Sequence, residues 1–169
     1  MKTKRLAALG LLTGVALILF AVEAQIPPVV PVPGVKIGLA NIVTVFAVFM
    51  LGAKDGALVL AARIFLGAVF AGNFSSILYS AAGGFFAILT VIGLKRALQD
   101  SQIWIAGCLG AVAHGVGQML VAVPVSGTPA ILIYLPVLVA CGIITGAFTG
   151  LCAQALLNRG SKLWKTIFR

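Results

Sequence analysis

The sequence predicts an all-α integral membrane protein, a bundle of six transmembrane helices in a single domain spanning residues 1–169. Two observations predict this class. The chain is 62% hydrophobic, with a mean hydropathy of +1.19 and only 9% charged residues, whereas soluble domains carry about 25% charged residues. The apolar residues also fall in long runs, separated by short segments rich in glycine, proline or basic residues.

The predicted helices follow these apolar runs in order. A membrane span needs about 20 residues, with about 17 as the lower limit. The second and third helices are therefore short, and the sixth is long enough for Pro136 to kink or restart it. The six predicted ranges are 6–22, 37–51, 57–71, 77–94, 103–123 and 130–157.

Basic residues predict the orientation of the bundle. They precede the first helix, join the second to the third, and follow the fourth and the sixth, whereas only Lys36 lies on the other side. Because cytoplasmic loops are enriched in lysine and arginine, both termini of this multi-pass membrane protein are predicted to be cytoplasmic. A cleaved signal peptide ending near Ala24 is the alternative, but the apolar run 6–22 is longer than the apolar region of most signal peptides.

Polar residues occur inside the predicted helices. Arg63 lies near the middle of the third helix, where a charge costs about 2.5–3.5 kcal/mol on insertion scales unless it faces a partner or a wet cavity. A rise of about 1.5 Å per residue places the other polar residues in the outer half of the bundle. These are Glu23, Lys36, Asn41, Tyr79, His114, Gln118 and Tyr134.

Two interpretations explain why these polar residues lie at a similar depth. In the first, the outer half holds a ligand pocket covered by the proline-rich loop 25–34, which prolines stiffen, while Arg63 and Glu23 are structural. In the second, these groups form hydrogen bonds between helices. The mainly aliphatic surroundings suit a small aromatic or prenyl-like molecule better than a sugar or an ion. The predicted ligand-binding residues are Lys36, Asn41, Tyr79, His114, Gln118 and Tyr134.

Glycines at every fourth position mark two helix surfaces. Small residues with this spacing let helices approach closely in lipid. Gly142, Gly146 and Gly150 in the sixth helix are predicted to pack within the bundle. Gly10 and Gly14 in the first helix are predicted to dock a partner membrane protein.

Several function classes are disfavoured. The three acidic residues Glu23, Asp55 and Asp100 are far apart, whereas magnesium-dependent chemistry on diphosphates usually needs clustered carboxylates. No phosphate-binding loop motif is present, and His114 has no second metal ligand on its helix. The net charge of +9 is spread over short loops, which fits membrane orientation and not nucleic-acid binding. The sequence therefore predicts no catalytic residue, cofactor or metal in this chain.

Four stretches resemble the Gx transporter family, whose members are labelled heptaprenyl diphosphate synthase component I. They are residues 33–42 (PGVKIGLANI), 78–84 (LYSAAGG), 110–118 (GAVAHGVGQ), and 134–136 (YLP) with the glycines that follow. This family is similar to the S components of energy-coupling factor (ECF) transporters, which capture vitamins. The resemblance covers nearly the whole chain, about residues 10–157.

The resemblance implies a six-helix, multi-pass subunit of a prokaryotic cell membrane that captures a small molecule from outside for import. In S components, small residues of the first helix dock on a membrane T subunit, and two cytoplasmic ATPases drive the cycle. Gly10 and Gly14 would take this role in place of the usual alanines. The synthase label fits poorly, because the paired aspartates of prenyl synthases are absent. The alternative implied by the family is a quinone-handling membrane subunit of an extracellular electron-transfer or prenyl-quinone pathway.

Overall fold

A computed structural model describes residues 2–27, 38–72 and 75–168, and of residues 2, 75, 100 and 161–168 it describes the backbone alone. Within these residues the fold contains helices and no strand, which confirms the predicted all-α class. Two 3-10 helices are present, η1 (Asp100–Gln102) and η2 (Pro129–Tyr134). The α-helices are α1 (Lys2–Glu23), α2 (Asn41–Leu51), α3 (Ala53–Ala71), α4 (Ser75–Lys95), α5 (Ile103–Ser126) and α6 (Leu135–Phe168).

Several helices are suited to cross a membrane. Among the described residues, four segments are long and apolar enough: Thr3–Glu23, Ser76–Lys95, Ile103–Ser126 and Pro129–Gly160. The 11 residues of α2 span only about 16 Å at 1.5 Å per residue, and α3 carries three charged residues. The chain is therefore a multi-pass membrane protein. Six complete crossings stay a prediction.

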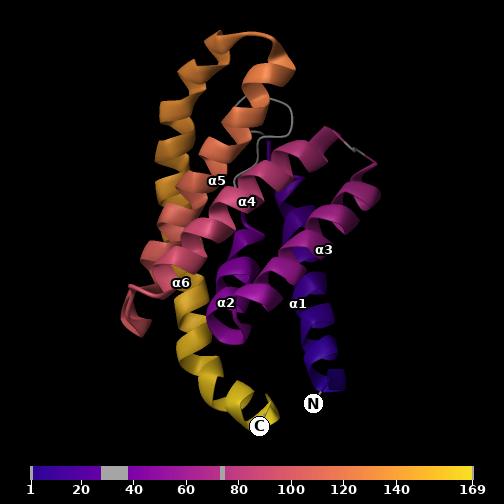
Figure 1. The fold of residues 1–169 in the computed structure, drawn as a ribbon, viewed down its shortest axis with the longest axis vertical. Helices are drawn as coiled ribbons and strands as arrows, with labels where there is room; N and C mark the ends of the chain where they lie inside the picture. Colours follow the sequence, from indigo (N-terminus) through magenta and orange to yellow (C-terminus); the bar gives the residue numbers. More distant parts are fainter. Residues whose placement is uncertain (1, 28–37, 73–74, 169) are drawn as a thin grey trace.

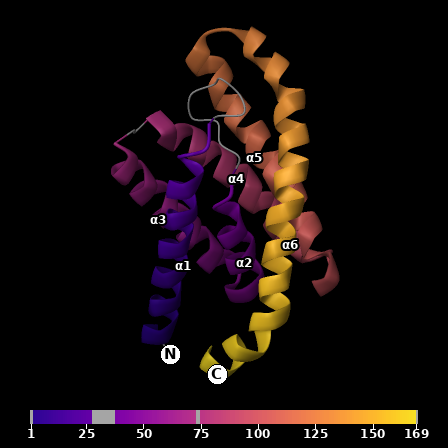
Figure 2. The same cartoon turned by 180° about the vertical axis from the view of Figure 1, so that it is seen from behind.

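The short helix α2 lies at the centre of the bundle. It is placed between α1 and α6 in both views (Figure 1 and Figure 2), and it contacts all five other α-helices. Seven of its eleven residues are buried. Its aliphatic side chains join those of the surrounding helices in the main apolar core. Outside it, α5 and α6 form an antiparallel hairpin whose turn lies at the end opposite the termini (Figure 1).

The helices around α2 begin at other residues than the sequence predicted. Helix α2 begins at Asn41 and not near residue 37, because Gly38 has a φ of +88° and donates its N–H to the Glu23 side chain. Helix α3 begins at Ala53 and not at residue 57. Only Gly52, with a φ of +107°, separates α2 from α3. The predicted loop containing Lys54 is therefore the first turn of α3.

The predicted sixth helix, 130–157, consists of two parts. Helix η2 ends at Tyr134, and α6 follows as a separate helix with Pro136 in its first turn, where proline is tolerated because that N–H needs no helical partner. The backbones of α5 and α6 then pack closely. A Cβ added to Gly107 would lie 2.4 Å from the Gly150 Cα, and one added to Gly150 would lie 2.5 Å from the Trp104 carbonyl oxygen. The sixth-helix glycines therefore pack within the bundle.

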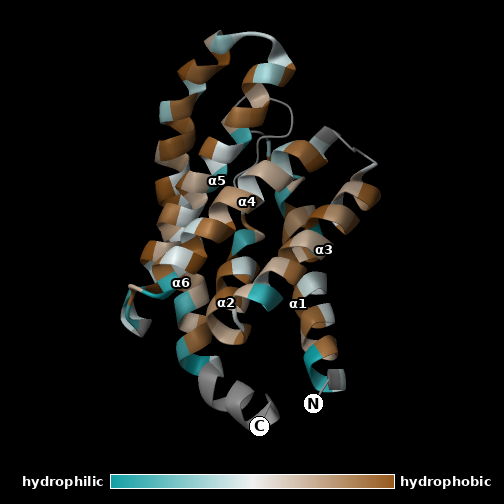
Figure 3. Cartoon of the chain, viewed as in Figure 1, coloured by the Kyte–Doolittle hydropathy of each residue, from teal (hydrophilic) through white to brown (hydrophobic). Residues whose placement is uncertain are grey.

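Charged residues connect neighbouring helices at the end of the bundle where both termini lie. Arg5 of α1 binds Asp55 of α3 through two contacts, Nε to Oδ2 at 2.9 Å and Nη2 to Oδ1 at 2.5 Å. Lys95 Nζ, at the end of α4, donates to the carbonyls of Val48 (2.6 Å) and Phe49 (3.1 Å) at the end of α2. Figure 3 shows hydrophilic residues gathered at this end, with hydrophobic residues along most of the helices.

Membrane orientation gives the first testable prediction. Because basic residues flank the end that carries the termini, we expect that end to face the cytoplasm. In a background with Cys108, Cys141 and Cys152 replaced by alanine, Val30→Cys should react with a membrane-impermeant maleimide in intact cells. Ser161→Cys should react only after the cells are opened. Labelling of Ser161→Cys in intact cells would reverse the orientation.

Candidate functional site

Glu23 joins the end of α1 to the chain entering α2. Its side chain is buried, with a relative exposure of 5%. The carboxylate accepts the backbone N–H of Gly38 and, at 3.0 Å, that of Leu39. Because two backbone donors compensate the burial of this acidic side chain, the chain entering α2 is held against the end of α1.

Arg63 extends this polar cluster from α3. It is 5% exposed, and its Nη2 lies 3.5 Å from Asn41 Oδ1 at the start of α2. The guanidinium also has an electrostatic interaction with Glu23. A buried charge in a membrane bundle needs such partners, and Arg63 obtains them from α1 and α2. The structural role of Arg63 and Glu23 stays a prediction.

His114 brings α5 into the same cluster. Its ring packs against α4 at Gly83, where an added Cβ would lie 2.8–2.9 Å from three ring atoms. An added Cβ on Gly38 would lie 2.8 Å from Asn41 Nδ2 and 4.0 Å from His114 Cδ2. The ring also donates a hydrogen bond to the Gly83 backbone, and the Arg63 guanidinium is close enough to repel a positive charge on the ring. The cluster of Glu23, Asn41, Arg63 and His114, termed the polar cluster below, therefore combines residues from α1, α2, α3 and α5.

Two glycines of this site were missed as site residues from the sequence. Gly38 and Gly83 leave the space that Asn41 and His114 occupy. Both lie in the stretches that carry the family resemblance, residues 33–42 and 78–84. The available signal was their place within one helical turn of Asn41 and Tyr79 in the sequence, since a glycine permits close approach of another group.

Three nitrogen atoms of the polar cluster have no hydrogen-bond partner among the described residues. They are Asn41 Nδ2, Arg63 Nε and His114 Nδ1, all buried. The asparagine and arginine nitrogens can only donate. The His114 ring donates from its other nitrogen to the Gly83 backbone, so Nδ1 of the neutral ring is an acceptor. Buried polar groups are nearly always hydrogen-bonded in native proteins. The arrangement therefore offers donors to a molecule that brings acceptor oxygens.

The other predicted ligand-binding residues lie in different surroundings. Gln118 follows His114 by one turn and is 1% exposed. Tyr79 is buried in a second apolar cluster with Met119, Ala122 and Leu138, and Tyr134 packs against this cluster. Lys36 and most of the loop 25–34 lie outside the described residues. The structure thus unites Asn41 and His114 with Glu23 and Arg63, and it places the two tyrosines in an apolar cluster of their own.

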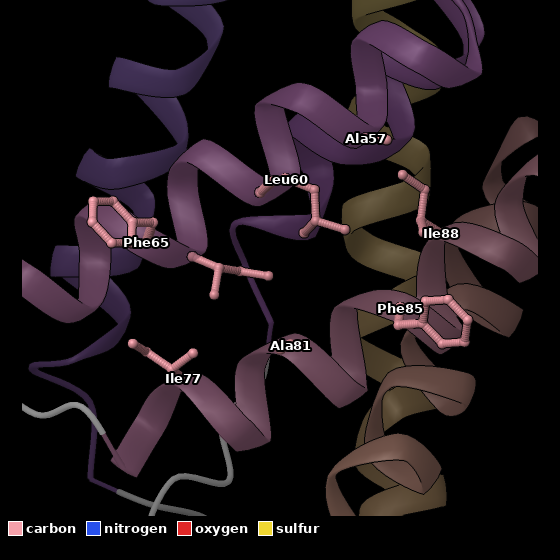
Figure 4. Close-up of a pocket in the computed structure, with 9 residues that line it drawn as sticks. Ala57, Leu60, Phe65, Ile77, Ala81, Phe85 and Ile88 are labelled. Atoms are coloured by element: carbon pink, nitrogen blue, oxygen red, sulfur yellow. The ribbon is translucent and has the colours of Figure 1, made fainter.

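The structure also contains a hollow on its surface, which lies apart from the predicted site. It has a volume of about 370 Å³ and opens between α3 and α4 (Figure 4). All of its lining residues are apolar, and none was predicted to bind the ligand. Among the described residues, no three His, Cys, Asp or Glu side chains gather as metal ligands. The cysteines are free, and Cys108 donates to the Ile143 carbonyl at 3.3 Å.

The family model described as heptaprenyl diphosphate synthase component I matches residues 12–156. The chain belongs to this family. The match includes every residue of the polar cluster and Gly14, but it begins after Gly10. No curated protein and no solved structure was found to be similar to the chain.

Proposed function

We propose that this member of the heptaprenyl diphosphate synthase component I family is a substrate-binding membrane subunit resembling the ECF S components. It captures a small, aromatic or prenyl-like molecule from outside a prokaryotic cell for import with an ATP-driven partner. The observation that carries the proposal is the set of buried nitrogen donors in the polar cluster. Family membership supports the membrane-subunit part of it.

The chemistry of the cluster supports a ligand with acceptor oxygens on an apolar skeleton. Glu23 is engaged by two backbone N–H groups, so the cluster presents donors more than acceptors. Asn41 Nδ2, as a donor, and His114 Nδ1, as an acceptor, are the proposed ligand contacts. Arg63 Nη2 holds Asn41 by the opposite atom of its amide, Oδ1, which leaves Nδ2 available. A carbonyl or carboxylate oxygen satisfies the Asn41 donor, whereas a protonated amine has no acceptor to offer it.

The position of the cluster supports capture from outside. It lies where α1 ends and α2 begins. The basic residues Arg5, Lys54 and Lys95 lie together at the other end of the bundle. With the basic end in the cytoplasm, the end with Glu23 and Asn41 faces the external side. The main apolar core fills the cytoplasmic part of α2, around Val45 and Val48.

The proposed partner surface is the face of α1 that carries Gly10 and Gly14. A Cβ added to either glycine would meet no atom within 4 Å. Leu6, Leu11 and Ile18 of α1 are also exposed. Glycines that face away from their own bundle let the backbone of a second membrane protein approach closely. The proposed partner is a T-type membrane subunit that works with two cytoplasmic ATPases.

Docking is tested by adding large side chains to this face of α1. We expect Gly10→Leu with Gly14→Leu to leave the protein folded and ligand-competent, because open space surrounds both positions. Recovery of a T subunit by pull-down from native membranes should fall below detection. Gly93→Leu is the matched control, since Gly93 on α4 also has open space around it. Unchanged recovery by the double variant would place the interface elsewhere, and loss of folding would make the glycines intramolecular contacts.

The same pull-down separates the two function classes. Recovery of a T subunit and ATPases with the wild-type protein supports import. Recovery of flavoproteins or quinone enzymes without them would instead favour the quinone-handling subunit, whose ring carbonyls would also satisfy the donors of the polar cluster.

A further inference from the structure

The hollow between α3 and α4 is an apolar groove with a defined floor and rim. Leu60 and Ile88 are buried at its floor, whereas Phe65 and Phe85 are 63% and 57% exposed at its rim. Figure 4 shows Ala57 and Ile88 at one end and Phe65 and Ile77 at the other. The full lining of this α3–α4 groove is Ala57, Leu60, Ala61, Ile64, Phe65, Ile77, Ala81, Phe85 and Ile88.

Small residues create the groove. Ala57 and Ala61 occupy successive turns of α3, and Ala81 faces them from α4. All three are exposed. From Ala57 to Phe65 the helix rises about 12 Å at 1.5 Å per residue, which approaches the thickness of one leaflet, half of the about 30 Å hydrocarbon core. The groove therefore has the length and the surface of a site for one lipid chain.

The groove is separate from the polar cluster. Arg63 lies on the buried face of α3 and interacts with Asn41, whereas the groove opens on the other side of Leu60 and Ile64. None of its lining residues offers a polar side chain. An occupant with a polar headgroup must therefore place that group beyond one end.

Basic residues lie beyond one end of the groove, where a charged headgroup could be placed. Lys95 Nζ and Gly52 N–H both reach the Val48 carbonyl, at 2.6 and 3.1 Å, so the end of α4 meets the start of α3 there. Lys54 follows Gly52 by two residues, Arg96 follows Lys95, and both side chains are exposed. The nearby Asp55 is engaged by Arg5. Positive charge thus lies beyond the Ala57 and Ile88 end of the groove.

We propose that the α3–α4 groove binds an acyl chain of an anionic phospholipid, whose phosphate is held by Lys54 and Arg96. Basic residues between helices at the membrane surface bind such headgroups, and long basic side chains reach to that level from within the bilayer. The apolar lining accepts the chain, and the charge selects the headgroup. This site is independent of the proposed import ligand.

Native mass spectrometry of the delipidated full-length protein tests the proposal, with dioleoyl phosphatidylglycerol and dioleoyl phosphatidylcholine as probes. The wild type should prefer phosphatidylglycerol. Lys54→Gln with Arg96→Gln should lower this preference by about fivefold per residue and retain binding of both lipids. Ala61→Leu with Ala81→Leu should weaken binding of both lipids about tenfold, the effect of losing about two buried methylene groups.

Matched controls lie outside the groove. Ala140→Leu adds the same side chain to an exposed position of α6, and Arg159→Gln removes an exposed charge near the end of α6. Both should bind lipid as the wild type does. The proposal would be overturned if Ala140→Leu or Arg159→Gln lost as much lipid binding as the groove variants. It would also be overturned if Ala61→Leu with Ala81→Leu bound both lipids as strongly as the wild type. Loss of a co-purified small molecule on filling the groove would assign the groove to the import ligand and likewise overturn it.

Discussion

Gly150→Leu is expected to prevent stable folding of the α5–α6 hairpin. An added Cβ would lie 2.5 Å from the Trp104 carbonyl oxygen and 2.7 Å from the Trp104 Cα. Both are backbone atoms, so no side chain can turn away. Overpacking typically costs about 1–3 kcal/mol and sometimes more, and we expect the upper end here because two helices would have to separate.

The measurement is the yield of monodisperse protein in mild detergent, followed by its thermal unfolding. Gly150→Leu should lose most of the wild-type yield and lower the unfolding temperature of what remains. Gly93→Leu is the control, because a Cβ at Gly93 meets no atom within 4 Å, and it should behave as the wild type. Equal yield and unfolding temperature in Gly150→Leu would mean that α5 and α6 do not approach closely at this seam.

Arg63→Leu is expected to impair accumulation of the protein more than its ligand binding. The change removes the guanidinium that contacts Asn41 and interacts with Glu23. Removing one partner of a buried charge pair typically costs about 3–5 kcal/mol, because the other charge stays buried. Arg63→Lys should recover part of the yield, since it restores the charge without the planar donor fork.

Membrane-fraction yield and ligand occupancy of the remaining folded protein distinguish the roles of Arg63. Arg159→Leu makes the same chemical change at an exposed position of α6 and should leave the yield unchanged. Normal accumulation of Arg63→Leu with complete loss of ligand would make Arg63 a ligand contact, contrary to the structural assignment.

Composition and apolar runs were sufficient to predict the helical class, because backbone groups in lipid must be satisfied internally. The start of α2 could not be predicted in this way. It depends on a carboxylate at Glu23 binding the N–H of Gly38, fifteen residues later, and such a contact leaves no local pattern. The joint between α2 and α3 was also missed, since Gly52 alone makes a turn for which the sequence suggested a longer loop.

The structure brings some of the predicted site residues together and places others apart. Counting residues along the helices placed Asn41 and His114 at a similar depth, and the structure brings both beside Gly38. Tyr79 and Tyr134 lie in or against an apolar cluster with Met119, Ala122 and Leu138. Which side of a helix faces the site depends on its rotation. Helices that are apolar on all sides carry only a weak signal of rotation in their sequence.

Mass spectrometry of small molecules released from the detergent-purified protein tests the central claim most directly. We expect one molecule with acceptor oxygens on an apolar skeleton, at near-stoichiometric amounts, in the wild type and in the control Thr90→Val, a polar position of α4 outside the cluster. Asn41→Leu should reduce its amount about tenfold or more. The change removes the Nδ2 donor and leaves the ligand oxygen buried without a partner, which typically costs about 1–3 kcal/mol. The absence of any such molecule, or equal amounts in Asn41→Leu, would contradict a ligand site at the polar cluster.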